Sequence, residues 1–526
     1  MSKTQHAGHW SATLRLHGLN LLVLLALGLL LLNLSWVGFT AADDDSYRLA
    51  ALAWLDDTQP NLGTSHWALR HTIVLPIAAS IALFGDSEFA LLLPSVMYFA
   101  LLSLAVYCFV ARITRPETAP KAALIATAAV MVLPICMVEY TRVVAEVAEL
   151  FWAIAALFTL VATRGTRREV SGAVMAGLLL GLAALTRETA AQLAIILAAV
   201  FLMRPQWISR KAIVLCGAAA ALVVGAEMLV YQIVHGDPLY RLMIDLHHGD
   251  AGGGIDRISD RGAGALSREG NIQVHWAIDP FLVILINEEF ALTFWLGIAF
   301  AIALFRNPAL VPSDTRKLIS LLFAFATASF VLVALAGPVL NLLPRYFMFS
   351  AVLVSVALAL ALPFLMASRP VLTSLFVAAS LSANLLAVNI ENRQPIALER
   401  TLVDSIAADS NIHVLLPTEK LENDTATLAH WRGVPPGTLT ADRTEARDGA
   451  AYWTLVLLPV EAGYDPDTQA RAIAALSGGR EYRLVDPGQP LLARTLAHLR
   501  GPLSFLHPDI RRRLMAPNRL AILVRG

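Results

Sequence analysis

The segment Leu19–Ala50, LNLLVLLALGLLLLNLSWVGFTAADDDSYRLA, joins an apolar stretch to three consecutive carboxylates. Its apolar part, roughly residues 19–39, is long enough to cross a bilayer as one helix, because about 20 apolar residues span the hydrocarbon core. Asp43, Asp44 and Asp45 follow directly. Since carboxylates are costly near hydrocarbon, the segment predicts a membrane span whose exit is acidic and faces water.

The composition of the whole chain agrees with a membrane protein. Of its 526 residues, 57% are hydrophobic and 15% are charged, and the mean hydropathy is +0.63. Soluble domains carry about 25% charged residues, so this class is excluded. The net charge of +0 argues against a nucleic-acid partner. Cys108, Cys136 and Cys216 lie within apolar runs, where they resemble small buried hydrophobic residues and have no disulfide or metal-ligand spacing.

Apolar segments of spanning length recur along the chain and predict a polytopic α-helical membrane protein with about eleven transmembrane helices. We place these helices at residues 19–39, 86–111, 122–138, 147–163, 171–185, 188–203, 212–234, 286–305, 318–336, 347–367 and 371–389. The transmembrane domain therefore covers residues 1–390.

Basic residues in the short loops give the orientation, because cytoplasmic loops carry an excess of Lys and Arg. Four loops on one face are basic: they contain Arg112, Arg115 and Lys121; Arg164, Arg167 and Arg168; Arg204, Arg210 and Lys211; and Arg306, Arg316 and Lys317. Placing this face in the cytoplasm puts the acidic triplet and two long loops, residues 40–85 and 235–285, outside.

The polar tail, residues 391–526, is also predicted to lie outside and to form a small α/β domain. NIHVLLP, YWTLVLLP and RLAILVR have the pattern of buried strands, and DTQARAIAALSG that of a helix ended by Gly. The tail contains no nucleotide-binding loop or nucleophile motif. We therefore expect it to have a supporting or acceptor-facing role.

Two interpretations of the acidic triplet stay open. Acids in the first turn of a helix suit its dipole, so the triplet is accounted for by a helix start. However, three acids exceed the needs of one cap, and the same face gathers separated cations, namely Arg70, His71, Arg142, Arg187 and Arg345. Lone cations at helix ends also extend toward lipid headgroups, and Arg187 has Glu188 as a neighbour. Arg345, between Pro344 and Tyr346, is the best candidate for binding a phosphate through two hydrogen bonds.

Other polar residues on this face are candidates as well. Glu146 and Glu149 lie one helical turn apart at the outer start of a span, either because acids suit a helix N-terminus or because they face a polar cavity. His247, His248 and Asp250 suggest a metal site only weakly, because they lack the spacing of a helical zinc site. We predict no metal site here.

The sequence resembles the GT-C glycosyltransferases at four places. DDDSY, Asp43–Tyr47, is similar to their acidic D-E/D-x-x-Y signature, and LFGDSEFALLLPS, Leu83–Ser95, to their entry to the second span. GLLLGLAALTRET, Gly177–Thr189, and PRYF, Pro344–Phe347, continue the resemblance, which covers roughly residues 20–370. The superfamily includes dolichyl-phosphate-mannose protein mannosyltransferases and lipid A aminoarabinose transferases. Its members move a sugar, with inversion, from a polyprenyl-phosphate carrier to an acceptor outside the cytoplasm.

The resemblance implies roles for individual residues. Asp43 and Asp44 match the catalytic acidic pair, and Tyr47 matches its aromatic residue. Glu146 falls where many members place an acid in the second outer loop, and Arg345 falls in a segment that helps to bind the carrier phosphate. The implied location is a bacterial inner membrane, with the active site on the periplasmic face.

The family's KPPL segment is LRHTIVLP here, so Arg70 or His71 replaces its Lys. We expect Asp43 or Asp44 to take a proton from the acceptor hydroxyl. Arg345, beside Tyr346 and helped by Arg70 or Arg187, would hold the phosphate, and Glu146 would orient the sugar or the acceptor.

The expected partners are a polyprenyl-phosphate sugar donor and a lipid, glycan or protein acceptor. No cofactor is predicted, and the use of a divalent cation stays open, as do the sugar and the carrier length. A secondary transporter or lipid-linked sugar flippase is the alternative function, although the polar residues gather on one face instead of at mid-membrane. A third class is a non-catalytic partner in an envelope complex.

Overall fold

A computed structural model describes residues 3–56, 65–247, 275–336, 342–388, 396–408, 412–442, 452–459, 462, 466–488 and 519–526. Eight helices in these ranges are long and apolar enough to cross a membrane. They are α1 (Lys3–Ser35), α4 (Glu88–Ile113), α7 (Ala145–Thr163), α8 (Glu169–Thr186), α10 (Arg210–His235), α15 (Ser313–Ala336), α16 (Met348–Ser368) and α17 (Pro370–Ala387). Shorter apolar helices are α3 (His71–Phe84), α5 (Ala119–Met131), α9 (Ala191–Met203) and α14 (Thr293–Arg306). The prediction of a polytopic α-helical membrane protein is confirmed.

Each of the eleven predicted spans overlaps one of these helices, but several bounds differ. The predicted span 122–138 is divided, because Pro134 begins a separate short helix, α6 (Pro134–Glu139). Proline has no amide hydrogen to continue a helix and is favoured in the first turn of the next one. The predicted span 286–305 begins instead at α14, after α13 (Asp279–Ile286) and a short turn, η4 (Glu288–Phe290). The apolar helix α3 was not predicted.

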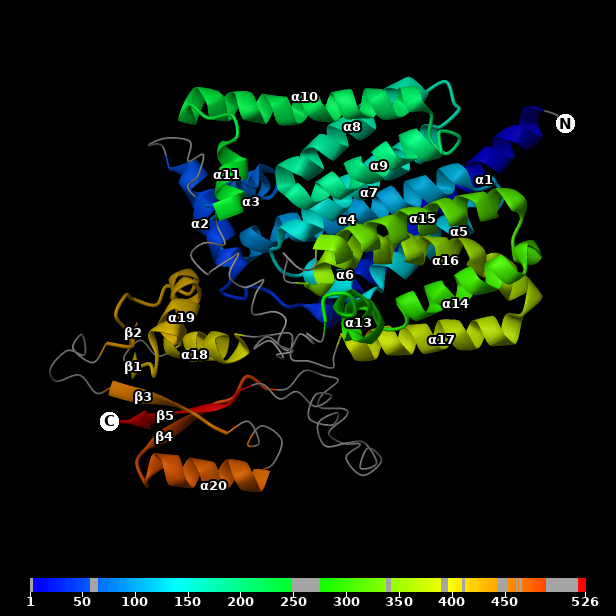
Figure 1. Cartoon of the computed structure of the whole chain (residues 1–526). Helices are drawn as coiled ribbons and strands as arrows, with labels where there is room; N and C mark the ends of the chain where they lie inside the picture. The colour runs from blue at the N-terminus through cyan, green and yellow to red at the C-terminus, as the bar shows by residue number, and fades with distance from the viewer. Residues whose placement is uncertain are drawn as a thin grey trace.

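The long helices run side by side as one bundle (Figure 1). Small residues allow close approach within it: a Cβ at Gly177 of α8 would collide with the Cys216 carbonyl oxygen of α10, and one at Gly181 with Val223. Large apolar side chains remain exposed on the outer helices, for example Leu222 (70%) and Val371 (74%). Such surfaces match a hydrocarbon solvent.

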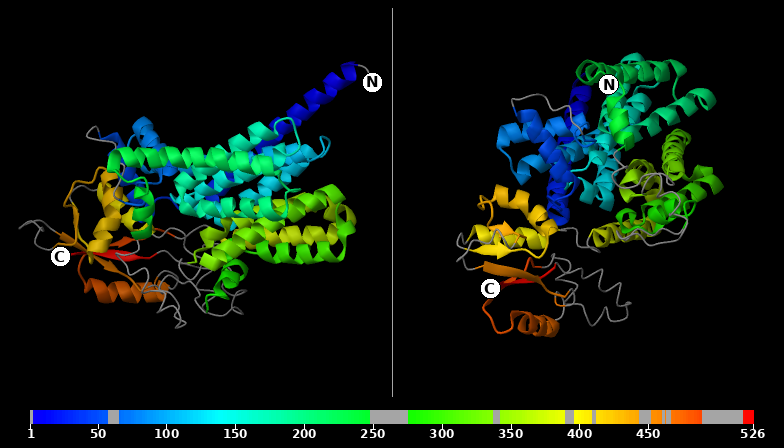
Figure 2. Two further views of the ribbon diagram at one scale, coloured as in Figure 1. Left: turned by 45° about the horizontal axis from the view of Figure 1, so that its top comes forward. Right: turned by 60° about the vertical axis from the view of Figure 1, so that its left-hand side comes forward.

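The polar elements collect at one end of the bundle (Figures 1 and 2). There lie α2 (Asp43–Leu55), α11 (Tyr240–His247) and a C-terminal five-stranded sheet of order β2-β1-β3-β5-β4. β1 pairs in parallel with β2 and β3, whereas β5 is antiparallel to β3 and β4. The strands are β1 (His413–Leu415), β2 (Leu439–Thr440), β3 (Tyr452–Leu457), β4 (Tyr482–Val485) and β5 (Ala521–Arg525), and the helices are α18 (Ala397–Ala407), α19 (Glu419–Trp431) and α20 (Pro466–Ser477). The three predicted strands and the predicted helix are confirmed.

An ion pair joins α18, and a hydrogen bond joins α19, to the membrane part. Arg48 of α2 donates through Nε and Nη2 to the two oxygens of Asp86, which also accepts a hydrogen bond of 3.0 Å from the Trp431 indole of α19. Arg400 of α18 binds both oxygens of Glu88 at the start of α4. The C-terminal sheet and its helices are therefore attached at the end of the bundle that carries the acidic triplet.

Candidate active site

The chain leaves α1 through a tightly held loop that leads to the acidic triplet. Gly38 has φ +80°, a conformation that suits glycine, and its amide donates to the Thr141 carbonyl at 2.9 Å. The Phe39 amide donates to Glu88 at 2.9 Å, and its carbonyl accepts from Arg400. The start of α2 is thus fixed against both the bundle and α18.

Asp44 is buried, with 1% exposure, and its carboxylate accepts four hydrogen bonds. One oxygen accepts from the Thr40 amide at 2.5 Å and its hydroxyl at 3.0 Å, and the other from the amides of Ala42 and Asp45 at 2.7 and 3.1 Å. Burial raises the pKa of Asp44, and these hydrogen bonds oppose that rise. The bonds flank Ala41, whose φ of +54° is uncommon for a residue with a Cβ. Asp44 therefore shapes the loop and offers no free lone pair to a substrate.

Asp43 and Asp45 differ from Asp44 in their surroundings. The Asp43 side chain is 42% exposed, and one of its oxygens lies 3.9 Å from an Arg345 Nη. Asp45 accepts a hydrogen bond of 2.8 Å from Thr427 of α19 and lies 3.6 Å from Arg48. Asp43 is the most exposed of the three acids, and it is the one that faces Arg345.

Glu146 is the centre of an ion cluster beside Asp43. Its Oε1 accepts from Arg187 Nη1 at 2.5 Å and lies 2.7 Å from Arg345 Nε, without the angle of a hydrogen bond. The Arg187 guanidinium stacks over the Tyr346 ring at 4.8 Å and donates to its hydroxyl at 3.4 Å. Glu146 thus holds two guanidiniums that are far apart in the sequence.

A pocket of about 210 Å³ adjoins this cluster. Its polar walls are Glu146, Glu149, Glu188, Thr189, Gln192, Arg345 and Tyr346, and α15 and α16 supply its apolar walls. Glu149 accepts a hydrogen bond of 2.7 Å from Thr189. The expectation that Glu146 and Glu149 face a polar cavity agrees with this geometry. The pocket combines charged groups with an apolar side, as a lipid-linked anion would require.

Tyr47 and Arg70 form a second layer behind the triplet. The Tyr47 hydroxyl is fully buried and accepts a hydrogen bond of 2.5 Å from Arg70 Nη1. Burial raises the pKa of Tyr47 to about 12, although Arg70 lowers it. Arg70 is itself 8% exposed and retains an Nε without a hydrogen-bond partner in the described chain. Its charge lies near the cluster, but its best contact is to Tyr47.

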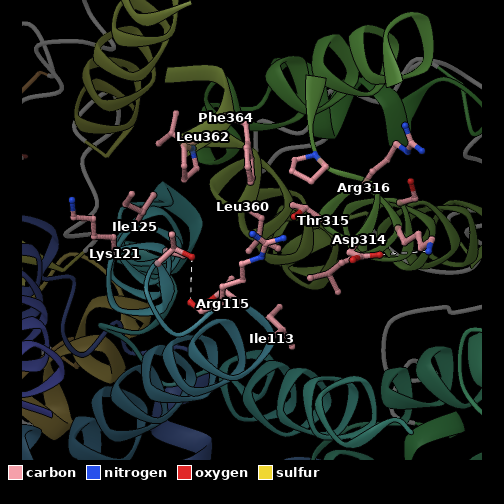
Figure 3. Close-up of a pocket in the computed structure, with 18 of the residues that line it drawn as sticks. Ile113, Arg115, Lys121, Ile125, Asp314, Thr315, Arg316, Leu360, Leu362 and Phe364 are labelled. Carbon is pink, nitrogen blue, oxygen red and sulfur yellow. Dashed lines mark hydrogen bonds and ion pairs between the residues drawn. The ribbon is translucent and has the colours of Figure 1, made fainter. Parts of the chain in front are cut away.

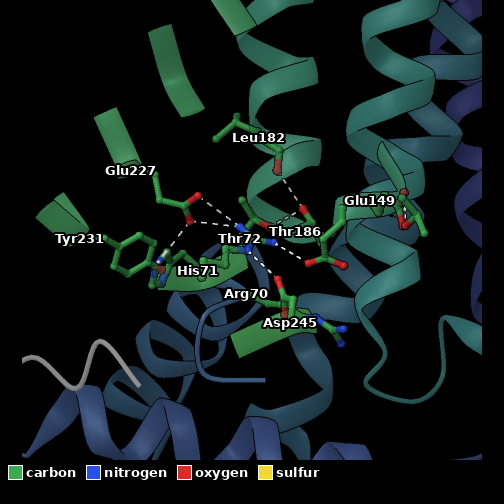
Figure 4. A network of polar contacts seen from close by, with 12 residues as sticks. Arg70, His71, Thr72, Glu149, Leu182, Thr186, Glu227, Tyr231 and Asp245 are labelled. Atoms are coloured by element: carbon green, nitrogen blue, oxygen red, sulfur yellow. Dashed lines mark hydrogen bonds and ion pairs between the residues drawn. The ribbon is translucent and has the colours of Figure 1, made fainter. Parts of the chain in front are cut away.

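His71 belongs to a different network, which Figure 4 shows around Tyr231 and Glu227. Its Nε2 lies 2.8 Å from the Tyr231 hydroxyl and 3.8 Å from Glu227. Burial, helped by the charge of Arg241, lowers the pKa of His71 to about 4, so the ring is neutral at pH 7. A neutral imidazole is a poor replacement for the lysine of the related motif.

Arg241 holds that network together and was not predicted. It lies 3.1 Å from Glu227, 3.3 Å from Glu188 and 3.4 Å from Asp245. The sequence contained one signal for it: Glu227 is an acid inside an apolar span, and such residues usually have a partner. Because Glu188 also lines the pocket, Arg241 connects α11 to the candidate site.

The remaining candidates do not line this pocket or lie outside the described residues. Arg142 is paired through two contacts with Glu139. His248 and Asp250 lie outside the described residues, as does the side chain of His247. Within the described ranges, no group of three His, Cys, Asp or Glu residues is arranged to hold a metal ion.

Comparison with known proteins gives one family match. Residues 72–231 match the model of the dolichyl-phosphate-mannose-protein mannosyltransferase family. No curated protein matches the chain. The matched segment includes Glu146 and Arg187 and runs from α3 to α10.

Two solved structures are also similar to this chain. The Archaeoglobus fulgidus oligosaccharyltransferase, tethered with an acceptor peptide, has a TM-score of 0.51 and 12% identity, covering 89% of this chain and 69% of that one. ArnT from Cupriavidus metallidurans bound to undecaprenyl phosphate has a TM-score of 0.40 and 12% identity, covering 95% and 97%. The family match and the first fold likeness confirm the resemblance to GT-C glycosyltransferases, and the transporter alternative is not favoured.

Proposed function

We propose that this chain moves a sugar, with inversion, from a polyprenyl-phosphate carrier to an acceptor on the periplasmic side of a bacterial inner membrane. The observation that carries the proposal is the approach of the exposed Asp43 carboxylate to Arg345, within a cluster that Glu146 ties to Arg187. A base and two phosphate-binding groups then belong to one cluster, and Arg345 of this cluster lines the pocket. The family match to residues 72–231 supports a glycosyl donor linked to a lipid phosphate.

Asp43 is the general base in this proposal. The acceptor hydroxyl oxygen attacks the anomeric carbon and gives its proton to Asp43, while the bond from that carbon to the phosphate oxygen breaks. The electron pair stays on the phosphate, so this leaving group needs no proton. A single displacement of this kind inverts the anomeric centre. Asp44 has a positioning role, because all its contacts are with its own loop.

Arg345 and Arg187 hold the carrier phosphate. Arg345 makes only a long contact of 3.9 Å with Asp43, so a phosphate oxygen competes well for that Nη group. Glu146 fixes the direction of both guanidiniums before the donor binds, which reduces the reorganisation during the reaction. Arg70 acts through Tyr47, and His71 stays neutral and positions α10 through Tyr231. Tyr346 orients Arg187 by stacking.

The two parts of the chain have separate tasks. Residues 1–390 carry the reaction, with the outer loops 40–85 and 235–285 beside it, and residues 391–526 face the acceptor. The contacts of Arg48 and Arg400 support this arrangement, because they attach the C-terminal part next to the acidic loop. The transferred group is a hexose or pentose, and the acceptor is a glycolipid, polysaccharide or protein.

The test uses the purified full chain in lipid nanodiscs with undecaprenyl phosphate carrying a radiolabelled hexose or pentose. Envelope lipid, glycan and protein fractions serve as acceptors. If the chain transfers the sugar, free carrier phosphate is released and the label appears in one acceptor fraction. Both products should be lost in the Asp43→Asn variant. Label that crosses the bilayer still attached to its carrier would instead indicate transport and would overturn the proposal.

A further inference from the structure

A second and larger cavity, of about 1690 Å³, lies away from the candidate active site. Its walls come from the ends of α4, α7 and α16 and the starts of α5, α15 and α17 (Figure 3). Ile125, Leu360 and Phe364 belong to its apolar part. The volume exceeds the 300–1,000 Å³ or so of a typical small-molecule site, which suits a ligand with long hydrocarbon chains.

The cavity is at the opposite membrane face from the active site. Helix α7, which is 19 residues long, begins beside Glu146 in the active site and ends at Thr163, next to the cavity residue Arg164. Likewise, the end of α15 lines the active-site pocket, and its start lines this cavity. Nineteen helical residues extend about 28 Å, close to the thickness of the hydrocarbon core. The two cavities are therefore separated by about one bilayer.

Positive charge gathers at the cavity. Its basic lining residues are Arg115, Lys121, Arg164, Arg316 and Lys317. Asp314 is the one acid among the lining residues that the structure describes, and it pairs with Lys317 at 3.5 Å. Within the described residues, the other four make no ion pair with a carboxylate. In this part of the chain, the guanidiniums of Arg316 and Arg164 donate to the carbonyls of Pro308 and Gln206.

We propose that this cavity binds an anionic phospholipid of the leaflet opposite the catalytic face. The unpaired cations take the phosphate headgroup, and the apolar walls between α5, α16 and α17 take part of the acyl chains. Arg115 and Lys121 come from the loop and helix after α4, and Arg316 comes from α15, so the basic lining combines parts of the chain about 200 residues apart. This site is independent of the proposed sugar transfer.

Native mass spectrometry of the full chain in detergent tests the proposal. Dioleoyl phosphatidylglycerol is titrated against dioleoyl phosphatidylcholine, and glycerol 3-phosphate serves as the soluble anion. Basic residues attract anionic lipid to any membrane surface. The control therefore removes three charges of the same face outside the cavity, with Arg167, Arg168 and Arg306 changed to Gln. The test variant changes Arg115, Lys121 and Arg316 to Gln.

We expect one phosphatidylglycerol to be retained in preference to phosphatidylcholine, to resist glycerol 3-phosphate, and to bind at least about tenfold more weakly to the test variant than to the control. Ala378→Trp, which fills the apolar wall and keeps every charge, should weaken binding as well. Equal loss in the test and control triples would mean general surface attraction. Displacement by glycerol 3-phosphate would mean a site for a soluble anion. Either result, or retention without headgroup preference, overturns the proposal.

Discussion

Asparagine substitutions at Asp44 and Asp43 should have different consequences. In Asp44→Asn, an amide nitrogen replaces one of two oxygens that each accept two hydrogen bonds. Whichever way the amide turns, two donors then face an NH₂ group. Hydrogen bonds to a charged group are worth about 1.5–3 kcal/mol each, so the loop around Ala41 should lose about 3–6 kcal/mol. That loss is a large share of the stability of an ordinary domain.

Asp43→Asn should leave stability unchanged within about 0.5 kcal/mol, because the side chain is 42% exposed and its ion contact is long. Its effect should fall on catalysis, where loss of a general base lowers the rate by about 10²–10⁴.

The two variants are compared by thermal unfolding in nanodiscs and by turnover of a labelled carrier-linked sugar. We expect Asp43→Asn to unfold like the wild type and to be nearly inactive, and Asp44→Asn to unfold earlier. The reasoning is refuted if Asp44→Asn keeps wild-type stability, or if Asp43→Asn keeps wild-type turnover while Asp44→Asn alone is inactive and fully stable.

Three further predictions concern the surroundings of the site. The pKa of His71 is lowered from 6.5 to about 4. Between pH 6.5 and about 4, the His71 imidazole therefore binds a proton in the unfolded chain but not in the native one. The unfolding midpoint should therefore fall as pH drops from 6.5 toward 4, with a smaller fall in His71→Gln. Gly177→Val should destabilise the packing of α8 on α10 by about 1–3 kcal/mol in denaturation, whereas Gly225→Val, which has open space, should not. Arg400→Gln should lower turnover by loosening the loop before Asp43, and the exposed Arg432→Gln should not, as steady-state rates would show.

The sequence was sufficient to predict the helices whose length is set by the thickness of the bilayer. A span such as 212–234 needs only its apolar length to be recognised, because an unpaired backbone cannot enter hydrocarbon. Strands such as β3 and β5 were visible because their apolar runs are short and bounded by polar residues. The division at Pro134 was missed because the apolar run continues through it, and α3 was missed because its 14 residues fall short of the roughly 20 that span a bilayer.

The partners within the site were beyond a single sequence. Arg187 has Glu188 as its neighbour in the chain, yet it pairs with Glu146, 41 residues away, because the short turn η1 (Glu188–Ala190) directs the Glu188 carboxylate toward Arg241. Likewise, DDDSY does not tell which acid is buried; only the turn at Ala41 places Asp44 inward and leaves Asp43 exposed. Tertiary geometry decides both.

The affinity for the donor phosphate tests the central claim most directly, and Arg345→Gln is the decisive variant. Binding of undecaprenyl phosphate to the full chain is measured by titration, with Arg142→Gln as the control, since Arg142 is paired with Glu139. Loss of a charged hydrogen-bond donor should weaken binding by about ten- to a hundredfold in Arg345→Gln. Equal affinities in wild type, control and Arg345→Gln would contradict a carrier-phosphate site at Arg345.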